Sequence, residues 1–329
     1  MTGTVPEGSP PRVPVTIVSG FLGAGKTSLL NHILTADHGR RLAVLVNDFG
    51  AINIDAELIT NRNEEVVSLA NGCICCNLED GLLMAALRLV RREPPPEQIL
   101  IETSGVADPV QVAHTFEDPE LQPYAPLDGV VTVVDAELGP DLAGDMMQLA
   151  RRQVAAADVV VLNKTDLVED AQRERARGWV QALAPGARLL EVSHGRAPLE
   201  LILGIGGVAG LPAKGETGAG EGHSAPPFDT CTFVHEGPLS MSRLHDTLRD
   251  MPKTIFRAKG VVNLIEKPDY PVILQFTGSR ATMTVGDGWS GGEPRTRIVF
   301  IGTPGGVDES WLSTQLTGSA TKQRTPDAE

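Results

Sequence analysis

The most constraining feature of the sequence is the segment GFLGAGKT at 20–27, which matches the phosphate-loop pattern G-x-x-x-x-G-K-[ST]. An apolar run at 15–18 precedes it, and apolar residues at helical spacing follow it at 28–34. The pattern indicates nucleotide binding when a strand leads into the loop and a helix leaves it. Both are expected here, so the sequence favours a phosphate loop over a glycine-rich turn that merely precedes a lysine.

Each residue type in this loop suits the binding of phosphate. Glycines let successive backbone N–H groups approach phosphate oxygens without a Cβ in the way. The N-terminus of the following helix adds a dipole that attracts anions. Lys26 supplies a positive charge toward the β- and γ-phosphates, and the Thr27 hydroxyl is a suitable ligand for Mg²⁺.

Composition excludes several other classes of protein. The formal net charge is -14, and nucleic-acid backbones are bound by clustered lysine and arginine, so we expect no nucleic-acid partner. An apolar run of about 18 residues, long enough to span a bilayer, is absent, so we expect no membrane partner. Residues 1–12 lack the apolar stretch of a signal peptide and are expected to be a disordered lead-in. The clustered cysteines argue against a disulfide framework and for a reducing cytoplasm.

Strand-like and helix-like segments alternate through most of the chain. Apolar strands are expected at 42–46, 66–69, 98–101, 130–135 and 159–162, and helices at 28–34 and 78–91. Repeated βα units with apolar strands predict a P-loop NTPase domain of the α/β class, with a mainly parallel sheet covered by helices. Such sheets bind their ligands at the carboxyl ends of the strands.

A change in composition predicts a second domain. The glycine-rich segment 205–227 is expected to be a flexible linker between the P-loop domain at 13–204 and a domain at 228–317, and residues 318–329 are expected to be a disordered tail. Strands are expected at 230–234, 260–264, 272–276 and 297–301, and helices at 241–251 and 308–316. These elements predict a smaller α+β domain, with Cys231 in its core.

The tetrad Asn163-Lys164-Thr165-Asp166 follows an apolar strand and matches the guanine-selective pattern N-K-x-D. A carboxylate such as that of Asp166 can accept hydrogen bonds from both the N1–H and the exocyclic amine of guanine. Adenine lacks this donor pair, so the carboxylate would be left unpaired. Together with the phosphate loop upstream, the tetrad favours GTP. An ordinary strand-end turn and an ATP-dependent kinase on the same scaffold are the alternatives.

Glu102 and Gly105 follow the apolar strand expected at 98–101. Glu102 occupies the place of the acidic residue that holds Mg²⁺ in such domains, and its length predicts a contact through water. The backbone N–H of Gly105 is suited to the γ-phosphate. A solvated acid at the end of a strand is the alternative for Glu102.

The segment Cys73-Ile74-Cys75-Cys76 is a candidate site for a transition metal. Residues two apart in an extended segment point the same way, so Cys73 and Cys75 can converge on one ion, and Cys76 can join if the chain turns. Three thiolates suit Zn²⁺ or another soft-to-borderline metal such as Co²⁺, with a fourth ligand from elsewhere or from solvent. Buried apolar cysteines and a redox pair are the alternatives.

Five motifs in combination, GFLGAGKT, NDFGAINID, NGCICCNL, ETSGVADP and NKTD, resemble the CobW-like GTPases, relatives of UreG and HypB. The second half resembles the C-terminal domain of the same family through RAKG at 257–260 and RIVFIG at 297–302. The resemblance implies a GTP-hydrolysing metallochaperone that delivers a transition metal to a client metalloprotein or a cofactor-synthesis enzyme. A homodimer is a candidate assembly.

The resemblance also implies roles by motif position. The phosphates and Mg²⁺ would be held by Gly23, Ala24, Gly25, Lys26, Thr27, Ser28, Glu102 and Gly105. Guanine would be held by Asn163, Lys164, Asp166 and Ser193, and the transported metal by Cys73, Cys75 and Cys76. Lys26, Thr27, Glu102 and Asp48, which lies in the expected switch loop, would form the catalytic set. Ala51 stands where many members carry an acid, and the linker retains only His223 of a histidine-rich run.

Nucleotide state can control the metal in such a protein, because the cysteines lie in the same stretch of chain as the expected switch loop. In this hypothesis the GTP form holds the metal, and hydrolysis to GDP releases it. Intrinsic hydrolysis is expected to be slow, because no arginine of the motifs is placed near the γ-phosphate. The alternative is a regulatory GTPase switch that has structural cysteines and binds a partner protein without transferring metal.

Overall fold

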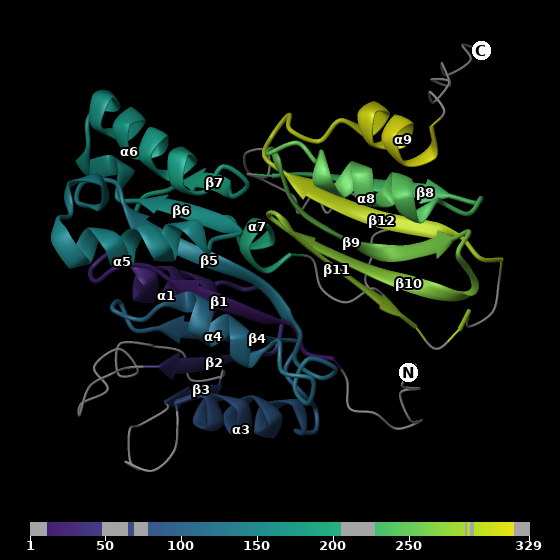
Figure 1. The fold of residues 1–329 in the computed structure, drawn as a ribbon, viewed down its shortest axis with the longest axis horizontal. Helices are drawn as coiled ribbons and strands as arrows, with labels where there is room; N and C mark the ends of the chain where they lie inside the picture. Colours follow the sequence, from purple (N-terminus) through teal and green to yellow (C-terminus); the bar gives the residue numbers. More distant parts are fainter. Residues whose placement is uncertain are drawn as a thin grey trace. The chain divides into compact units, whose positions relative to one another are not determined.

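The computed structural model describes residues 12–47, 65–68, 78–204, 228–286, 288–289 and 293–318, and the chain divides into two compact units between Ile202 and Leu203 (Figure 1). The expected lead-in, linker and tail lie outside the described residues, apart from Arg12 and Gly318. None of the helices in the described part of the chain has the length and apolar character needed to cross a membrane.

The first unit is built from alternating strands and helices, as the sequence predicted. Its strands are β1 (Val15–Ser19), β2 (Leu42–Asn47), β3 (Glu65–Ser68), β4 (Gln98–Thr103), β5 (Leu127–Asp135), β6 (Val159–Asn163) and β7 (Arg188–Glu191). Its helices are α1 (Lys26–Thr35), α3 (Leu78–Val90), α4 (Pro109–Thr115), α5 (Gly144–Ala155), α6 (Asp170–Leu183) and α7 (Leu199–Leu203), with short 3₁₀ turns at Gly139–Asp141 and Thr165–Leu167.

The seven strands form one sheet in the order β3-β2-β4-β1-β5-β6-β7, and every pair is parallel. All residues of β1 and β6 are buried, as expected for strands covered on both faces. Parallel strands bring their carboxyl ends to one edge of the sheet. The register pairs Val18 of β1 with Glu102 of β4, and Asp135 of β5 with Asn163 of β6. The predicted parallel sheet is therefore confirmed, and it gathers the polar strand ends.

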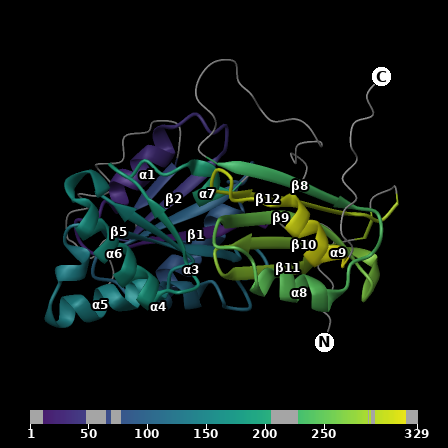
Figure 2. The ribbon, with the colours of Figure 1, turned by 90° about the horizontal axis from the view of Figure 1, so that it is seen from above.

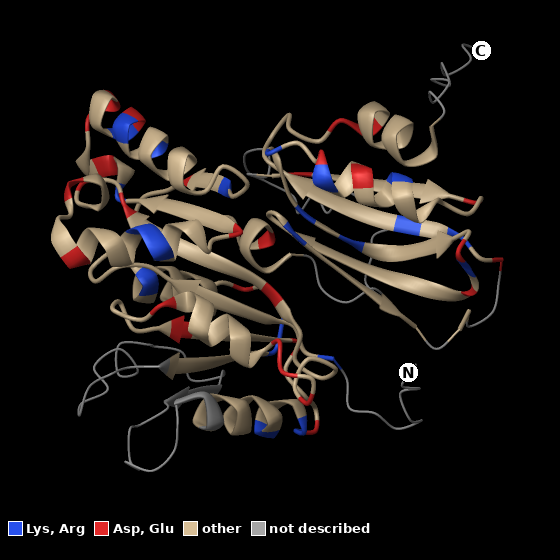
Figure 3. Ribbon diagram, in the orientation of Figure 1, with Lys and Arg blue, Asp and Glu red and all other residues tan. Residues whose placement is uncertain are grey.

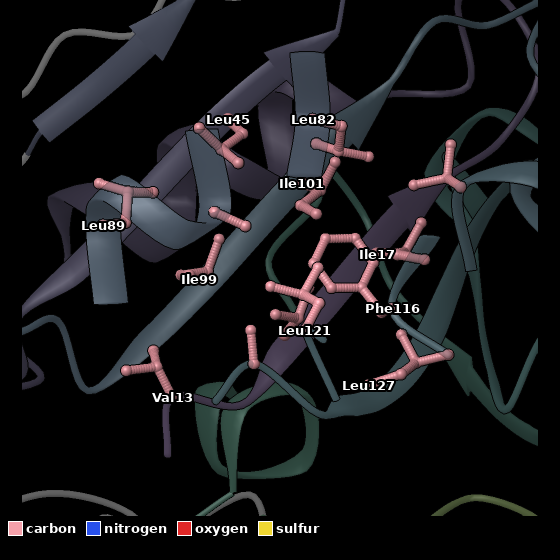
Figure 4. Packing of buried hydrophobic residues seen from close by; sticks show 14 of the residues in the cluster. Val13, Ile17, Leu45, Leu82, Leu89, Ile99, Ile101, Phe116, Leu121 and Leu127 are labelled. Atoms are coloured by element: carbon pink, nitrogen blue, oxygen red, sulfur yellow. The ribbon is translucent and has the colours of Figure 1, made fainter. Parts of the chain in front are cut away.

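Apolar side chains from the helices fill the spaces beside this sheet. Figure 4 shows Ile17 of β1 and Ile99 of β4 in one cluster with Leu82 of α3 and Phe116 after α4. A neighbouring cluster joins β5 and β6 to α5 and α6, and includes Val160. Figure 2 shows α1 on the opposite side of the sheet from α4 and α5. Helices therefore cover both faces of the sheet. This packing holds β1 and α1 in place, and the phosphate loop joins these two elements.

The second unit has five antiparallel strands in the order β11-β10-β9-β12-β8. The elements are β8 (Asp229–His235), α8 (Met241–Arg249), β9 (Ile255–Leu264), β10 (Lys267–Thr277), β11 (Arg280–Val285), β12 (Thr296–Gly302) and α9 (Glu309–Thr317). Leu244 of α8 and Leu312 of α9 pack with Phe276 and Phe300 of the sheet in one core. Cys231 is partly buried against that core. The predicted α+β class is confirmed.

The structure corrects several expected boundaries. Strand β4 continues to Thr103, so Glu102 lies inside the strand and not after it. Strand β9 begins at Ile255, five residues before the expected start at Gly260. Strands β7 and β11 and helix α4 were not predicted. Strand β11 is an edge strand whose residues alternate between half-buried and exposed, so it lacks the apolar run that marks a central strand.

Charged side chains are spread over both units, and acidic and basic residues lie close together on α6 (Figure 3). Within α6, Arg173 pairs with Asp170, and Arg177 pairs with Glu174 at 3.1 Å. These pairs join residues three apart on a mostly exposed surface, so each contributes little to stability.

Candidate nucleotide-binding site

The phosphate loop follows β1 and leads into α1, in the context that the sequence predicted. Gly20 has φ 141°, and a Cβ at this residue would lie 2.2 Å from the carbonyl oxygen of Val133. Gly25 has φ 105°, and a Cβ there would lie 2.3 Å from Nδ2 of Asn163. L side chains rarely adopt these φ angles, and both positions also lack space. The two glycines therefore let the loop pass between β5 and the end of β6.

Lys26 is held against the loop that it follows. Its Nζ donates a hydrogen bond to the carbonyl oxygen of Gly20 at 2.9 Å and to that of Phe21 at 3.4 Å. The side chain is mostly buried, because the residue is only 8% exposed. A buried ammonium group attracts a phosphate more strongly than one in water does, because the surrounding dielectric is lower. The position of the ammonium group suits the role that the sequence analysis gives it.

Thr27 and Glu102 meet beside the loop. The Thr27 hydroxyl donates a hydrogen bond to Oε1 of Glu102 at 2.9 Å, and Glu102 is only 2% exposed. A hydroxyl and a carboxylate are the oxygen donors that Mg²⁺ prefers, so these two residues fit the ion. They come from α1 and β4, which are far apart in the sequence, and the parallel sheet brings them together.

Replacing Glu102 with glutamine is expected to raise the Mg²⁺ concentration that GTP binding requires by about tenfold, because it removes the negative charge that attracts the cation. The amide retains an oxygen for the Thr27 hydroxyl, so the local packing is preserved. Titrating Mg²⁺ into protein mixed with a fluorescent GTP analogue measures the effect. Glu120→Gln, at an exposed residue of the same unit, is the control. An unchanged Mg²⁺ requirement in Glu102→Gln would rule out this role for Glu102.

Asn163 connects three segments at the end of β6. Its Nδ2 donates to the carbonyl oxygen of Ala24 in the phosphate loop at 2.9 Å. Its Oδ1 accepts from the backbone N–H of Gly195, also at 2.9 Å. The side chain is almost completely buried. The amide thus fixes the phosphate loop relative to the turn at 193–195, a positioning role that the sequence pattern does not reveal. Direct contact between Asn163 and the base stays a prediction.

Lys164 is held by an acid that the sequence analysis did not identify. Lys164 adopts the left-handed conformation, with φ 63°, and its Nζ lies 2.7 Å from Oδ2 of Asp135. Asp135 is 6% exposed, and its Oδ1 accepts from the backbone N–H groups of Glu137 and Leu138. This nearly buried carboxylate therefore orients Lys164 at the edge of the candidate base site. An acid that ends a long apolar strand was the available signal in the sequence.

Asp166 and Ser193, both expected at the base, are brought together by β6 and β7. A hydrogen bond from Ser193 is the main cause that lowers the pKa of the Asp166 carboxyl below its ordinary value, and His194 contributes to the same shift. The Nε2 atom of His194 lies 3.6 Å from Oδ2 of Asp166. A lowered pKa keeps Asp166 ionised, which is the state that accepts both hydrogen bonds from guanine.

Replacing Ser193 with alanine is expected to shift the acid limit of GTP binding to higher pH. The hydrogen bond from Ser193 lowers the pKa of Asp166, so its loss lets the carboxyl become protonated earlier as the pH falls. Nucleotide affinity measured from neutral to acidic pH tests this. The matched control is Ser310→Ala on α9, at an exposed position. Overlapping pH profiles for wild type and Ser193→Ala would show that Ser193 does not support the base-binding carboxylate.

Gly105 lies against the phosphate loop, as its expected role requires. A Cβ on Gly105 would lie 2.6 Å from Cδ2 of Leu22 and 2.8 Å from the backbone nitrogen of Leu22. Glycine is therefore needed for this close approach. The loop at 104–108, which joins β4 to α4, thus passes directly beside the expected position of the phosphates.

The structure does not describe the residues expected to bind the transported metal, nor the expected switch residue Asp48. Cys73, Cys75, Cys76 and Asp48 lie outside the described residues. Within the part of the chain that is described, no group of three or more His, Cys, Asp or Glu residues could hold a metal ion. The metal site and its fourth ligand therefore stay predictions.

Comparison with known proteins agrees with this fold and these motifs. Residues 14–191 match the family described as CobW/HypB/UreG, nucleotide-binding domain, and residues 228–319 match the Cobalamin synthesis protein cobW C-terminal domain. The chain is 32% identical to the zinc chaperone CobW of Pseudomonas aeruginosa, over 93% of this chain and 91% of that protein. It is 28% identical to the zinc chaperone CobW of a Sinorhizobium species, over 93% and 97% respectively.

A relative with a different name matches over a smaller share of the chain. The zinc-regulated GTPase metalloprotein activator 1 of Dictyostelium discoideum is 35% identical, over 59% of this chain and 49% of that protein. The two family matches cover both units of the structure in the order that the motifs predicted. The chain therefore belongs to the CobW/HypB/UreG family and carries the CobW-type C-terminal domain.

Proposed function

We propose that this protein is a GTP-hydrolysing metallochaperone, which binds a divalent transition metal through Cys73, Cys75 and Cys76 and delivers it to a client metalloprotein or a cofactor-synthesis enzyme. Zn²⁺ is the favoured cargo, with Co²⁺ as the second candidate. The observation that carries the proposal is the meeting of the candidate phosphate-binding and base-binding residues at one edge of the parallel sheet. The names of the relatives, zinc chaperone and zinc-regulated GTPase metalloprotein activator, support the choice of zinc.

Each candidate residue of the nucleotide site has a definite task in this proposal. Lys26 neutralises charge on the β- and γ-phosphates, and the glycines of the loop present backbone N–H groups to them. Thr27 and Glu102 hold Mg²⁺, which when bound neutralises charge that develops on the phosphates. Asp166 accepts from guanine, while Asp135 orients Lys164 and Asn163 fixes the phosphate loop. Asp48 acts from the switch loop.

Nucleotide-dependent release of the metal is energetically reasonable. Reversing a site from nearly full to nearly empty requires about 5.5 kcal/mol of differential stabilisation. Structural zinc sites have apparent binding free energies of about 10–16 kcal/mol, so a change in the position of one thiolate is enough to alter occupancy greatly. The cysteines follow β3 in the sequence, and β3 pairs with β2, whose carboxyl end leads to Asp48. This continuity supports coupling between the switch loop and the metal.

Replacing the three cysteines Cys73, Cys75 and Cys76 with serine tests the proposal. Wild-type protein purified with reductant and zinc is expected to retain about one metal ion per chain, and the triple variant about none, because serine is a poor ligand for Zn²⁺. GTP binding is expected to persist in both. Cys231→Ser, at a residue partly buried against the core of the second unit, is the control: it removes a thiol outside the proposed site and is expected to leave the amount of bound zinc unchanged.

The regulatory-switch alternative makes the opposite prediction. Its cysteines are structural, so the triple variant would still activate its partner, and the wild type would carry no exchangeable metal. Metal analysis of the wild type and a client-activation assay therefore separate the two functions. A triple variant that binds zinc as tightly as the wild type would overturn the assignment of these cysteines.

A further inference from the structure

Helix α5 reaches the loop at 104–108 through the side chain of Gln153. Nε2 of Gln153 donates to the carbonyl oxygen of Gly105 at 3.2 Å and to that of Ala107 at 3.0 Å. Gln153 is 1% exposed, and its backbone carbonyl oxygen accepts from the Thr132 hydroxyl on β5 at 2.9 Å. The two accepting carbonyls establish which end of the amide is nitrogen. Gln153 is thus fixed to the sheet on one side and fixes the loop on the other.

The loop that Gln153 holds is the one that passes beside the phosphate loop. Gly105 approaches Leu22 too closely for any side chain, so a small displacement of the loop changes the position of the Gly105 N–H relative to the phosphate loop. A second contact from α5 reaches the same segment, where Nε of Arg152 lies 3.3 Å from Oδ2 of Asp108. That pair is partly exposed and contributes little. The buried amide is therefore the stronger constraint.

Gln153 also lies beside a small, partly open cavity. The cavity has a volume of about 70 Å³, and its lining includes Gln153, Trp179 of α6, and Phe21 and Leu22 of the phosphate loop. Oε1 of Gln153 and Nε1 of Trp179 are both buried and have no hydrogen-bond partner among the described residues. Buried polar atoms without partners are uncommon in folded proteins. An acceptor and a donor of this kind beside one cavity mark this region as a candidate for a functional role.

We propose that Gln153 is a positioning residue for GTP hydrolysis. Its two donated hydrogen bonds set the path of the 104–108 loop, and thereby the direction of the Gly105 N–H toward the γ-phosphate. The same contacts transmit movement of the loop to α5 and to the cavity beside Trp179. The inference rests on the proposed function, since that function assigns the γ-phosphate contact to Gly105. GDP has no γ-phosphate, so the effect of Gln153 is specific to the GTP state.

Gln153→Met tests the proposal, because methionine has a similar length and shape but donates no hydrogen bond. The kcat for GTP hydrolysis is expected to fall about tenfold, which corresponds to about 1.4 kcal/mol in the barrier. GDP affinity is expected to stay within about twofold of wild type, since the loop makes no contact that depends on GDP. Gln148→Met, at an exposed position of the same helix, is the matched control and is expected to change neither value.

Tryptophan fluorescence gives a second readout that a purely structural role would not produce. The chain has three tryptophans, and Trp289→Phe with Trp311→Phe leaves Trp179 as the sole emitter. In this background the emission of Trp179 is expected to differ between protein with a non-hydrolysable GTP analogue and protein with GDP. Adding Gln153→Met is expected to remove that difference. Thermal unfolding confirms that each variant is folded.

The outcomes separate the inference from the function on which it rests. An unchanged kcat and an unchanged emission difference in Gln153→Met overturn the positioning role and leave the proposed function intact. Equal losses of affinity for the GTP analogue and for GDP also overturn it, because they show a structural role. Wild-type protein that neither binds nor hydrolyses GTP overturns the proposed function, and the inference with it.

Discussion

Lys26→Met is expected to lower kcat/KM for GTP hydrolysis by about 10²- to 10³-fold, the effect of removing one preorganised group that stabilises charge in a transition state. Lys26 is the mostly buried ammonium group of the phosphate loop, held by the carbonyl oxygens of Gly20 and Phe21. Methionine retains much of the length of the side chain and removes the charge. Steady-state release of phosphate measures the change.

The control for this variant is Lys253→Met, at an exposed position in the second unit, which is expected to hydrolyse GTP at the wild-type rate. Thermal unfolding of Lys26→Met establishes whether the lost hydrogen bonds to the loop also affect folding. Hydrolysis within about threefold of wild type in folded Lys26→Met protein would show that the loop is not the phosphate site. Removing a charge that contacts the phosphates is expected to lower the rate of hydrolysis much more than threefold.

Asp166→Asn is expected to lower the affinity for GTP by about 10²-fold and to raise the affinity for xanthosine triphosphate. The amide nitrogen of the asparagine would face the exocyclic amine of guanine. Both groups are hydrogen-bond donors, so neither finds an acceptor. Xanthine has a carbonyl oxygen in place of that amine, so the new amide can donate to it while its oxygen accepts from the ring N–H. Competition of the two nucleotides against a labelled analogue measures the exchange of preference.

Asp170→Asn is the matched control, since Asp170 is an exposed acid at the start of α6. It is expected to leave both affinities unchanged. If Asp166→Asn kept the wild-type preference, or if ATP competed as well as GTP with the wild type, the guanine assignment would be wrong. The ATP-dependent kinase on the same scaffold would then be the better interpretation.

The sequence predicted the architecture of the first unit because its signals are local. A strand, a glycine-rich loop and a helix follow each other within 15–35, and most of the buried strands are rich in apolar residues. The same reasoning missed β7 and β11. Strand β7 has only four residues, and Arg188, its first residue, is buried although it is charged, with its pKa lowered to about 10 by desolvation. Tertiary packing, and not local pattern, makes that segment a strand.

The candidate site was predicted less completely, because many of its contacts join distant parts of the chain. Motif position identified Lys26, Glu102 and Asp166, whose chemistry can be read from residue type. It did not reveal that Asn163 holds the phosphate loop, because that contact spans 139 residues. Nor did it find Gln153, which lies in an ordinary amphipathic helix and acquires its partners only when α5 packs beside β5. Residues that position other residues have little signature in a single sequence.

The proposed function depends most directly on one comparison, the zinc affinity of the protein with a non-hydrolysable GTP analogue and with GDP. Competition against a coloured chelator under reducing conditions measures both dissociation constants. The proposal predicts much tighter zinc binding in the GTP-analogue form, by about 10⁴-fold where occupancy reverses fully, because hydrolysis is the step that releases the metal. Equal dissociation constants in the two forms would contradict it, since a nucleotide that does not change the affinity for zinc cannot control its release.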